Sequence, residues 1–486
     1  MIKHIDLHLL SGNNFCKKHL LLGNDFEYLH LLPGNDIMET GDNMKRKIYD
    51  ELLNWKNKNH SQSLLVKGAR QVGKTFIIKE FGENEFENII YINFENQMDI
   101  RDSFDQMANP EEAIKILQAY GVSMNVFNIE KEKTLIFLDE IQLSKRAYSL
   151  LKPLTEMDRF KIIASGSLLG VNLGGRNLDP GPTVKHLEMH PMDFEEFLWA
   201  MFEDDFIKTI ENIKNDAKQG KLINEAYHSL FNKNIKEYII VGGMPQVVLS
   251  YKTNKNYGDV YIKQEEIVNL YRSDIQQYQT YQENKIKTLK CFDSIPKQFS
   301  KENHRFQYSI VKKGKKGRYF ENSIEWLERT GNVKKCYNIN HLSGSLIDGR
   351  GTSFKLFMND IGLLVNMLGK EYIYKIQNDE LGMFKGALWE QLLAQMLNAK
   401  TQDLYYIRLG DYEIDFLIQY NGNILPIECK SGGNTKSKSL KNYISKYTPT
   451  KAFKISMNNI NISNDIVKAI PHYIFALLSY DEIVNL

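Results

Sequence analysis

The sequence predicts an α/β fold that has a parallel sheet in its N-terminal half and a second α/β region at its C-terminal end. Three observations favour this fold. Short apolar runs alternate with amphipathic runs, a glycine-rich loop stands between the first strand and a helix, and three short strands follow a late helix. Strands that alternate with helices are typical of parallel sheets with right-handed crossovers. A chain of 486 residues is also long enough for about three domains.

The composition is that of a globular chain without a strong overall charge. Hydrophobic residues make up 42% and charged residues 25% of the chain, and the formal net charge is +2. Any contact with nucleic acid would therefore depend on local basic patches. The four cysteines form no CxxC pair, which disfavours a zinc module or a disulfide framework and suits a reducing compartment. Because we find neither a membrane-spanning apolar run nor a signal-peptide pattern, we expect a soluble, cytoplasmic protein with no membrane partner.

The strands of the first sheet are predicted from short apolar runs that follow an N-terminal extension. Residues 1–43 contain turn-forming glycine, proline and asparagine pairs, which indicate a flexible extension. The first amphipathic helix begins near Met44. We expect strands at 63–67, 89–94, 134–138, 160–164 and 184–189, and a helix at 111–120. These elements place the first domain over residues 44–200.

The rest of the chain is divided by its changes between helical and strand patterns. Residues 201–250 are expected to form a helical lid. Residues 251–370 contain helices followed by a strand pair, which is typical of a winged-helix domain. Residues 371–486 begin with a helix that carries Glu390 and predict a further α/β domain. The expected strands of these two regions lie at 334–339, 354–357, 404–407, 414–419 and 424–429.

A phosphate-binding loop is predicted between the first strand and the helix that follows it. The pattern GxxxxGK[ST] is matched by Gly68, Ala69, Arg70, Gln71, Val72, Gly73, Lys74 and Thr75. The glycines allow the loop to curl so that backbone N–H groups point at phosphate oxygens, and the helix N-terminus favours the same anion. Lys74 is expected to reach the β- and γ-phosphates, and Thr75 to ligate Mg²⁺. The loop therefore predicts the binding of ATP with Mg²⁺.

An acidic pair ends the third predicted strand. The apolar run 135–138 delivers Asp139 and Glu140 to the carboxyl edge of the sheet, where ligands bind in such folds. We expect Asp139 to hold Mg²⁺, usually through water, and Glu140 to polarise the water that attacks ATP. A solvated acidic turn is the alternative, but the loop at 68–75 favours the functional interpretation.

The order of these motifs resembles that of the bacterial and archaeal AAA+ ATPases whose C-terminal half is a domain of unknown function. The matching residues are the phosphate loop, Asp139-Glu140-Ile141-Gln142 and Ser165-Gly166-Ser167, and the resemblance runs from Met44 nearly to the C-terminus. It implies that Ser167, or alternatively Ser165, senses the γ-phosphate.

The same resemblance implies roles for two loop residues. Arg176 matches the position of an arginine finger that reaches a neighbour's ATP, which implies a homo-oligomer. A solvated loop arginine explains Arg176 equally well. Pro245 matches a GxP turn that touches the adenine, and the alternative is a plain loop break between helices.

A second group of charged residues in the C-terminal region resembles the PD-(D/E)xK nucleases. Glu390 lies on a predicted helix, Asp415 near the start of a strand, and Glu428-Cys429-Lys430 at the end of the next strand. Residues two apart on a strand share one face, so Glu428 and Lys430 point the same way. This resemblance implies a restriction-endonuclease-like fold. The alternative is a hairpin with ordinary surface charges.

In the nuclease interpretation these residues form a divalent-metal site. Asp415 and Glu428 would share Mg²⁺ or Mn²⁺, because carboxylate oxygens suit these hard cations, and Glu390 would complete the ligand shell. Lys430 would position or deprotonate the attacking water. The same fold also serves as a scaffold that binds without cutting, so the resemblance does not decide whether this chain cleaves nucleic acid.

A basic run supplies the last functional signal. Residues 312–318 read Lys-Lys-Gly-Lys-Lys-Gly-Arg and would contact phosphates if the winged-helix region bound DNA, although a solvated loop is an equally good explanation. Three hypotheses remain. The chain is an ATP-driven, DNA-associated enzyme with a nuclease-like domain, a nucleotide-regulated protein that only grips nucleic acid or a protein, or a regulatory ATPase with a protein partner.

Overall fold

The described part of the chain begins after the predicted extension. The computed structural model describes residues 44–58, 62–127, 129–167, 181–279, 281–299, 305–342, 344–382, 384–401, 403–410, 412–432, 437–462 and 466–486. The extension at 1–43 and Arg176 lie outside these residues, so the expectations for them stay predictions. Residues 44–486 form one compact unit.

The first sheet contains the five parallel strands that the sequence predicts. They are β1 (Ser63–Lys67), β2 (Asn88–Asn93), β3 (Thr134–Asp139), β4 (Lys161–Gly166) and β5 (Val184–Glu188), in the order β2-β3-β4-β1-β5. All four neighbouring pairs are parallel. The carboxyl ends of β1 and β3, which carry the two nucleotide motifs, therefore open on the same edge of the sheet.

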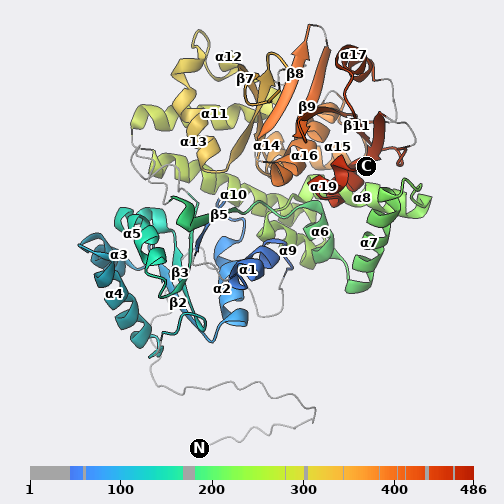
Figure 1. The fold of residues 1–486 in the computed structure, drawn as a ribbon. Helices are drawn as coiled ribbons and strands as arrows, with labels where there is room; N and C mark the ends of the chain where they lie inside the picture. The colour runs from blue at the N-terminus through green and yellow to red at the C-terminus, as the bar shows by residue number, and fades with distance from the viewer. Residues whose placement is uncertain are drawn as a thin grey trace, which may run out of the picture. The chain divides into compact units, whose positions relative to one another are not determined.

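Side chains of β1 alternate between two hydrophobic cores because successive residues of a strand point to opposite faces. Leu64 and Val66 pack in the core that also contains Phe81, whereas Leu65 packs in the core that contains Leu117 and Leu151. The first core is covered by α1 (Ile48–Lys56) and α2 (Lys74–Glu85), and the second by α4 (Pro110–Ser123) and α5 (Lys145–Glu156). Helices thus cover both faces of the sheet (Figure 1).

A helical region follows the first sheet and extends beyond residues 201–250, so the expected lid stays a prediction. It comprises α6 (Phe194–Met201), α7 (Asp204–Lys218), α8 (Glu225–Val241), α9 (Pro245–Asn254), α10 (Tyr257–Tyr278) and α11 (Gln282–Phe299). The short α12 (Tyr308–Val311) and the helix α13 (Glu321–Arg329) come before the next strand, and α14 (Ile361–Leu368) and α15 (Glu371–Gln377) follow the strand pair.

The second sheet has seven strands and joins the middle region to the C-terminal region. Its strands are β6 (Val333–Ile339), β7 (Arg350–Met358), β8 (Leu404–Leu409), β9 (Tyr412–Tyr420), β10 (Asn423–Cys429), β11 (Ala452–Ser456) and β12 (Val467–Pro471), in the order β12-β11-β10-β9-β8-β6-β7. It is a mixed sheet, since β6 pairs antiparallel with β7 and parallel with β8. Its helices include α16 (Phe384–Lys400), α17 (Lys438–Tyr447), α18 (His472–Leu477) and α19 (Tyr480–Val484), of which α16 lies beside β8 and β9 in Figure 1.

The strand pair that we expected as a separate wing is therefore one end of this sheet. The antiparallel pair β6-β7 forms as predicted, but the backbone of β6 also pairs with β8 from Cys336↔Leu404 to Ile339↔Ile407. Unpaired backbone groups along β6 would otherwise remain on an open edge, and pairing with β8 satisfies them. The strand pair is consequently not a free-standing ribbon, and the expected boundary near residue 370 falls between strands of one sheet.

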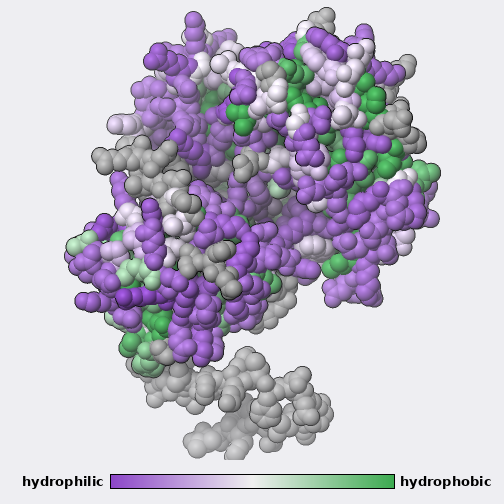
Figure 2. All heavy atoms as spheres, in the orientation of Figure 1, coloured by the Kyte–Doolittle hydropathy of each residue, from purple (hydrophilic) through white to green (hydrophobic). Residues whose placement is uncertain are grey.

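Among the described residues, no helix is both long enough and apolar enough to cross a membrane. Hydrophilic residues cover most of the face shown in Figure 2, and hydrophobic residues appear there only in separate patches.

Candidate functional site

The phosphate loop leaves β1 at Lys67 and enters α2 at Lys74. It curls through backbone of positive φ at Gln71 (67°) and Gly73 (95°). The conformation demands glycine at one further position, since a Cβ on Gly68 would lie 2.3 Å from the carbonyl oxygen of Met189. The glycines of the motif thus do what the sequence pattern requires, because they let the chain turn tightly before the helix.

The ammonium group of Lys74 is turned back on the phosphate loop. Its Nζ donates to the carbonyl oxygens of Gly68 at 3.0 Å and Ala69 at 2.9 Å. Burial lowers the pKa of Lys74, while the carboxylates of Glu140 and Asp139 oppose that shift. A buried cation that is satisfied only by carbonyl groups is well suited to exchange them for phosphate oxygens, so the loop fits ATP.

The two predicted Mg²⁺ ligands lie in contact. Thr75 Oγ1 donates to Asp139 Oδ2 at 2.8 Å, although 64 residues separate them. The hydroxyl of Ser165 donates to the other oxygen, Oδ1. Burial and the charge of Glu140 raise the pKa of Asp139, and the hydrogen bonds from Ser165 and Thr75 counteract this. A hydroxyl beside a buried carboxylate at a sheet edge fits the hard ligand set that Mg²⁺ prefers.

Glu140 follows Asp139 and takes a left-handed backbone conformation, with φ of 50°. Its Oε2 accepts hydrogen bonds from Gln142 Nε2 and, at 3.3 Å, from the hydroxyl of Ser167. The two serines at the end of β4 therefore contact different carboxylates. Ser165 contacts the carboxylate expected to hold the metal, and Ser167 contacts the carboxylate expected to activate water. Their roles toward the γ-phosphate stay predictions.

Two further residues of this site were missed by the sequence reasoning. Tyr91 OH donates to Asp139 Oδ2 at 3.2 Å, and Asn93 Nδ2 donates to the same oxygen at 3.3 Å. Both lie on β2, which pairs with β3 so that Asn93 stands directly beside Asp139. The available signal was a polar residue at the carboxyl end of a predicted strand, but the sequence alone does not say which strands are neighbours.

Pro245 lies against the phosphate loop. A Cβ built on Gly73 would stand 3.5 Å from Pro245 Cγ, and Pro245 is the first residue of α9. The turn before it is tightly enclosed, because a Cβ on Gly243 would lie 2.0 Å from the carbonyl oxygen of Met192. The backbone N–H of Gly243 donates to Asp360 Oδ2 at 2.6 Å. This placement suits the expected role of the proline at the nucleotide, which stays a prediction.

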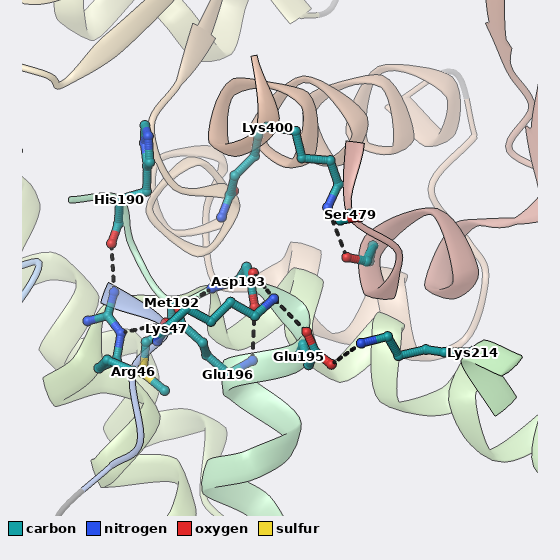
Figure 3. A network of polar contacts seen from close by, with 12 residues as sticks. Arg46, Lys47, His190, Met192, Asp193, Glu195, Glu196, Lys214, Lys400 and Ser479 are labelled. Atoms are coloured by element: carbon teal, nitrogen blue, oxygen red, sulfur yellow. Dashed lines mark hydrogen bonds and ion pairs between the residues drawn. The ribbon is translucent and has the colours of Figure 1, made fainter. Parts of the chain in front are cut away.

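A buried arginine, Arg46, contacts the phosphate loop at Val72. Figure 3 shows Arg46 beside His190 and Glu196. Arg46 donates through Nη1 to the carbonyl oxygen of Val72 at 2.9 Å, through Nη2 to that of His190 at 2.8 Å, and through Nε to Glu196 Oε1 at 3.1 Å. The side chains of Arg46 and Glu196 are 7% and 6% exposed. Glu196 also closes the capping box of α6 with Asp193. Arg46 carried no recognisable sequence signal.

The phosphate loop also contacts the middle region of the chain. Arg70 Nη1 lies 3.0 Å from Asp274 Oδ1 on α10, and Arg70 Nη2 lies 3.3 Å from Glu95 Oε1. Tyr271 OH donates to the carbonyl oxygen of Arg70 at 3.1 Å. Burial raises the pKa of Asp274 to about 6, and Arg70 limits this rise. A Cβ on Gly331 would lie 3.1 Å from Ala69 N, so the turn before β6 also packs on the loop.

In the second sheet, the predicted metal residues are only partly brought together. Carboxylate oxygens of Glu390, Glu413 and Asp415 lie within 4.8 Å of one another. Glu413 was missed, although it stands two residues before Asp415. Within the described residues Glu428 is not part of this group. Its Oε1 instead lies 2.7 Å from the ammonium of Lys430. Glu390 and Asp415 therefore meet as expected, while Glu428 and Lys430 form a separate pair.

A lysine from β7 stands inside the acidic group. Lys355 Nζ lies 2.6 Å from Glu390 Oε1 and 2.5 Å from Glu413 Oε1, and its side chain is 1% exposed. Burial alone would lower the pKa of Lys355, but the charges of Glu390, Glu413 and Asp415 hold it well above its usual range. Burial and the charge of Glu390 raise the pKa of Asp415 to about 7. With this ammonium in place, the residues do not fit the Mg²⁺ or Mn²⁺ ion that the nuclease interpretation expects.

Three protein families match consecutive parts of the chain. Residues 60–198 match the AAA domain family, and residues 232–372 and 385–475 match two domains of unknown function, DUF8612 and DUF4143. An uncharacterized protein of Methanocaldococcus jannaschii is 23% identical over 419 residues, which cover 82% of this chain and 80% of that protein. A second uncharacterized protein of the same organism is 24% identical over 219 residues, so the chain matches 42% of that protein's length.

Solved structures resemble this chain only distantly. The Walker-type ATPase PABY2304 of Pyrococcus abyssi is 14% identical, with a TM-score of 0.40, over 68% of this chain and 97% of its own. The Orc1 protein of Aeropyrum pernix, solved in complex with DNA, is 12% identical, with a TM-score of 0.29, over 69% of this chain and 96% of its own. Similarities this low support no inference about function. The family matches alone show an AAA-type P-loop ATPase domain followed by two domains of unknown function.

Proposed function

We propose that the chain binds ATP with Mg²⁺, hydrolyses it, and passes its nucleotide state to the second sheet. The observation that carries the first part is the contact between Thr75 and Asp139 at the carboxyl edge of the first sheet. It joins the phosphate loop to the acidic strand end in the manner that ATP hydrolysis requires. The match of residues 60–198 to the AAA domain family supports the same proposal.

Each residue of the site has a part in this reaction. Lys74 exchanges the carbonyl groups of its own loop for the β- and γ-phosphates, and Thr75 with Asp139 holds the metal. Bound Mg²⁺ supplies positive charge that neutralises the developing charge on the phosphate oxygens. Glu140 accepts a proton from the attacking water or orients it. Its bond to Ser167 supports the proposed role of that serine in sensing the γ-phosphate.

Two assignments rest on the family resemblance. Pro245 would contact the adenine, which its position against Gly73 favours. Arg176 would reach the ATP of a neighbouring copy in a homo-oligomer and lies outside the described residues.

Replacing Lys74 with alanine tests the proposal most directly. We expect Lys74→Ala to lower the rate of ATP hydrolysis by about 10²–10³-fold, because one preorganised donor to the transition state is removed. The measurement is phosphate release at saturating ATP, together with the binding of a fluorescent ATP analogue. Lys152→Ala, on the exposed face of α5, is the control and should retain hydrolysis. Full activity in Lys74→Ala would exclude this loop as the ATP site.

The contacts of Arg70 support the proposed link between the two sheets. The carbonyl oxygen of Arg70 accepts from Tyr271 OH, and that hydroxyl accepts from Asn359 Nδ2 at 3.2 Å. Asn359 follows β7 directly, so hydrogen bonds run without a break from the phosphate loop to the second sheet. A change in the loop on binding ATP would alter these contacts first.

For the partner of the middle region we propose DNA, with a protein partner as the alternative. The favouring observation is a cluster of basic side chains around the ring of Tyr319, in the middle region of the chain. Lys287, Lys315 and Lys312 place Nζ 3.9, 4.9 and 5.9 Å from the ring centroid. Glu283 pairs with Lys287 at 2.8 Å, which leaves the two exposed lysines as the main groups available to phosphates.

Removing these lysines should weaken DNA binding in a salt-dependent way. For Lys312→Ala/Lys315→Ala we expect lower affinity for duplexes of any sequence. We also expect the slope of log affinity against log salt to fall by about 1 for each DNA phosphate that the variant no longer neutralises. Fluorescence anisotropy with a labelled duplex at several salt concentrations measures both quantities. Lys208→Ala, on the exposed face of α7, is the control. A wild-type chain without salt-dependent DNA affinity would favour the protein partner.

A further inference from the structure

We infer that the ammonium group of Lys355 is the resident cation of the acidic cluster formed by Glu390, Glu413 and Asp415. It stands where a divalent metal would otherwise be held, and the second sheet therefore needs no metal. This inference does not depend on ATP hydrolysis at the first sheet.

The cluster places one buried ammonium among three carboxylates, two of which contact it directly. Glu390 is supplied by α16, Glu413 and Asp415 by β9, and Lys355 by β7. The Nζ atom lies 2.6 Å from one carboxylate and 2.5 Å from a second, and it faces the ring of Tyr406 at 4.8 Å from its centroid. With 1% of the side chain exposed, water has almost no access to the charge. An ammonium so enclosed is retained only if anions surround it.

One oxygen of each carboxylate near this ammonium is already engaged. Glu390 Oε1 and Glu413 Oε1 contact Lys355, and Asp415 Oδ2 accepts from the backbone N–H of Cys429 at 2.7 Å. A divalent ion needs oxygen ligands at roughly 2.0–2.6 Å. Bound to the same carboxylates, it would lie a few ångströms from the buried ammonium, where repulsion is strong because the surroundings screen weakly. The ion and the ammonium of Lys355 therefore exclude each other.

In the other half of the expected nuclease set only one carboxylate oxygen of Glu428 is engaged, since Oε2 is buried without a hydrogen-bond partner among the described residues. Glu428 Oε1 pairs with Lys430 Nζ at 2.7 Å, and the backbone carbonyl of Lys430 contacts His472 Nε2 at 3.0 Å. Glu390 thus pairs with Lys355 and Glu428 with Lys430, while Asp415 accepts from the backbone N–H of Cys429. This arrangement is suited to a rigid binding scaffold, and Lys355 fastens the strand pair β6-β7 to α16 and β9.

The test compares Mn²⁺ binding by four full-length proteins without nucleotide, with Mn²⁺ followed by electron paramagnetic resonance. The proteins are the wild type, Asp415→Asn, Lys355→Met and Lys355→Met/Asp415→Asn. We expect the wild type and Asp415→Asn to bind the same number of ions. Lys355→Met should bind one more ion, and the double variant should return to the wild-type number. Lys335→Met, which alters a lysine of the neighbouring strand β6, is the control and should bind no additional ion.

Two results would overturn the inference. One is a wild-type Mn²⁺ site that Asp415→Asn removes, and the other is a folded Lys355→Met protein that binds no additional ion. If Lys355→Met does not fold, thermal unfolding of the wild type decides. The unfolding midpoint of the wild type should be the same with Mn²⁺ and with a chelator. The unfolding midpoint of Asp415→Asn should likewise not change between these two conditions. A Mn²⁺-dependent rise in the wild type that is absent in Asp415→Asn overturns the inference.

Discussion

Glu140→Gln should bind ATP as the wild type does and hydrolyse it about 10²–10⁴-fold more slowly, which is the usual effect of removing a general base. Glutamine keeps the size of the side chain and an oxygen for the hydroxyl of Ser167, which lies 3.3 Å from Glu140 Oε2. It cannot take a proton from water. Lys74, Thr75 and Asp139 remain unchanged, so the affinity for ATP should persist. Single-turnover hydrolysis and equilibrium binding of ATP separate the two quantities.

The control for this prediction lies on the same segment of chain. Glu132 precedes β3 at the opposite end of the strand, is exposed and pairs with Lys161 at 3.7 Å. Glu132→Gln should therefore hydrolyse ATP at the wild-type rate. Asp139→Asn should differ from Glu140→Gln, because it weakens the hold on Mg²⁺ and so reduces affinity for Mg·ATP as well as hydrolysis. An unaltered rate in Glu140→Gln would exclude its role in activating water.

The nucleotide site was predictable because its signals are local in sequence. The loop at 68–75 is contiguous, and Asp139 with Glu140 ends an uninterrupted apolar strand. Each pattern therefore gives both its residues and its position at the end of a strand. The contact between Thr75 and Asp139 then follows from the parallel sheet, since the carboxyl ends of its strands lie at one edge.

The other contacts of the ATP site and of the second sheet depend on which distant segments of the chain become neighbours in the fold. Tyr91 and Asn93 reach Asp139 only because β2 pairs with β3 in that register. Lys355 reaches Glu413 because β6 pairs with β8 and joins β7 to the second sheet. An antiparallel strand pair has the same alternating pattern whether it stands alone or extends a sheet, so the sequence favoured a separate wing. The nuclease pattern likewise predicted the acidic residues, but it could not predict that the ammonium group of Lys355 lies among them.

Arg46 is the most distant of the missed residues, and its replacement should have the largest effect on stability. It contacts Glu196 across 150 positions of sequence and holds the carbonyl oxygen of Val72 in the phosphate loop. Removing one partner of a buried ion pair leaves the other charge uncompensated. We therefore expect Arg46→Met to lower the free energy of unfolding by about 3–5 kcal/mol. Urea unfolding followed by tryptophan fluorescence measures this, with exposed Lys58→Ala as a control that should change it by at most about 0.5 kcal/mol.

A second substitution separates the contribution of Arg46 to stability from its contribution to ATP binding. In Arg46→Met/Glu196→Gln no buried charge is left alone, but the single glutamine oxygen accepts from only one of the backbone N–H groups of Lys47 and Asp193, which Glu196 holds with separate oxygens. Stability should therefore recover in part. Affinity for ATP should stay reduced, because neither variant restores the hydrogen bond to Val72. If the double variant were as unstable as Arg46→Met, the uncompensated charge of Glu196 would not be the cause. If it bound ATP normally, Arg46 would be unnecessary for shaping the loop.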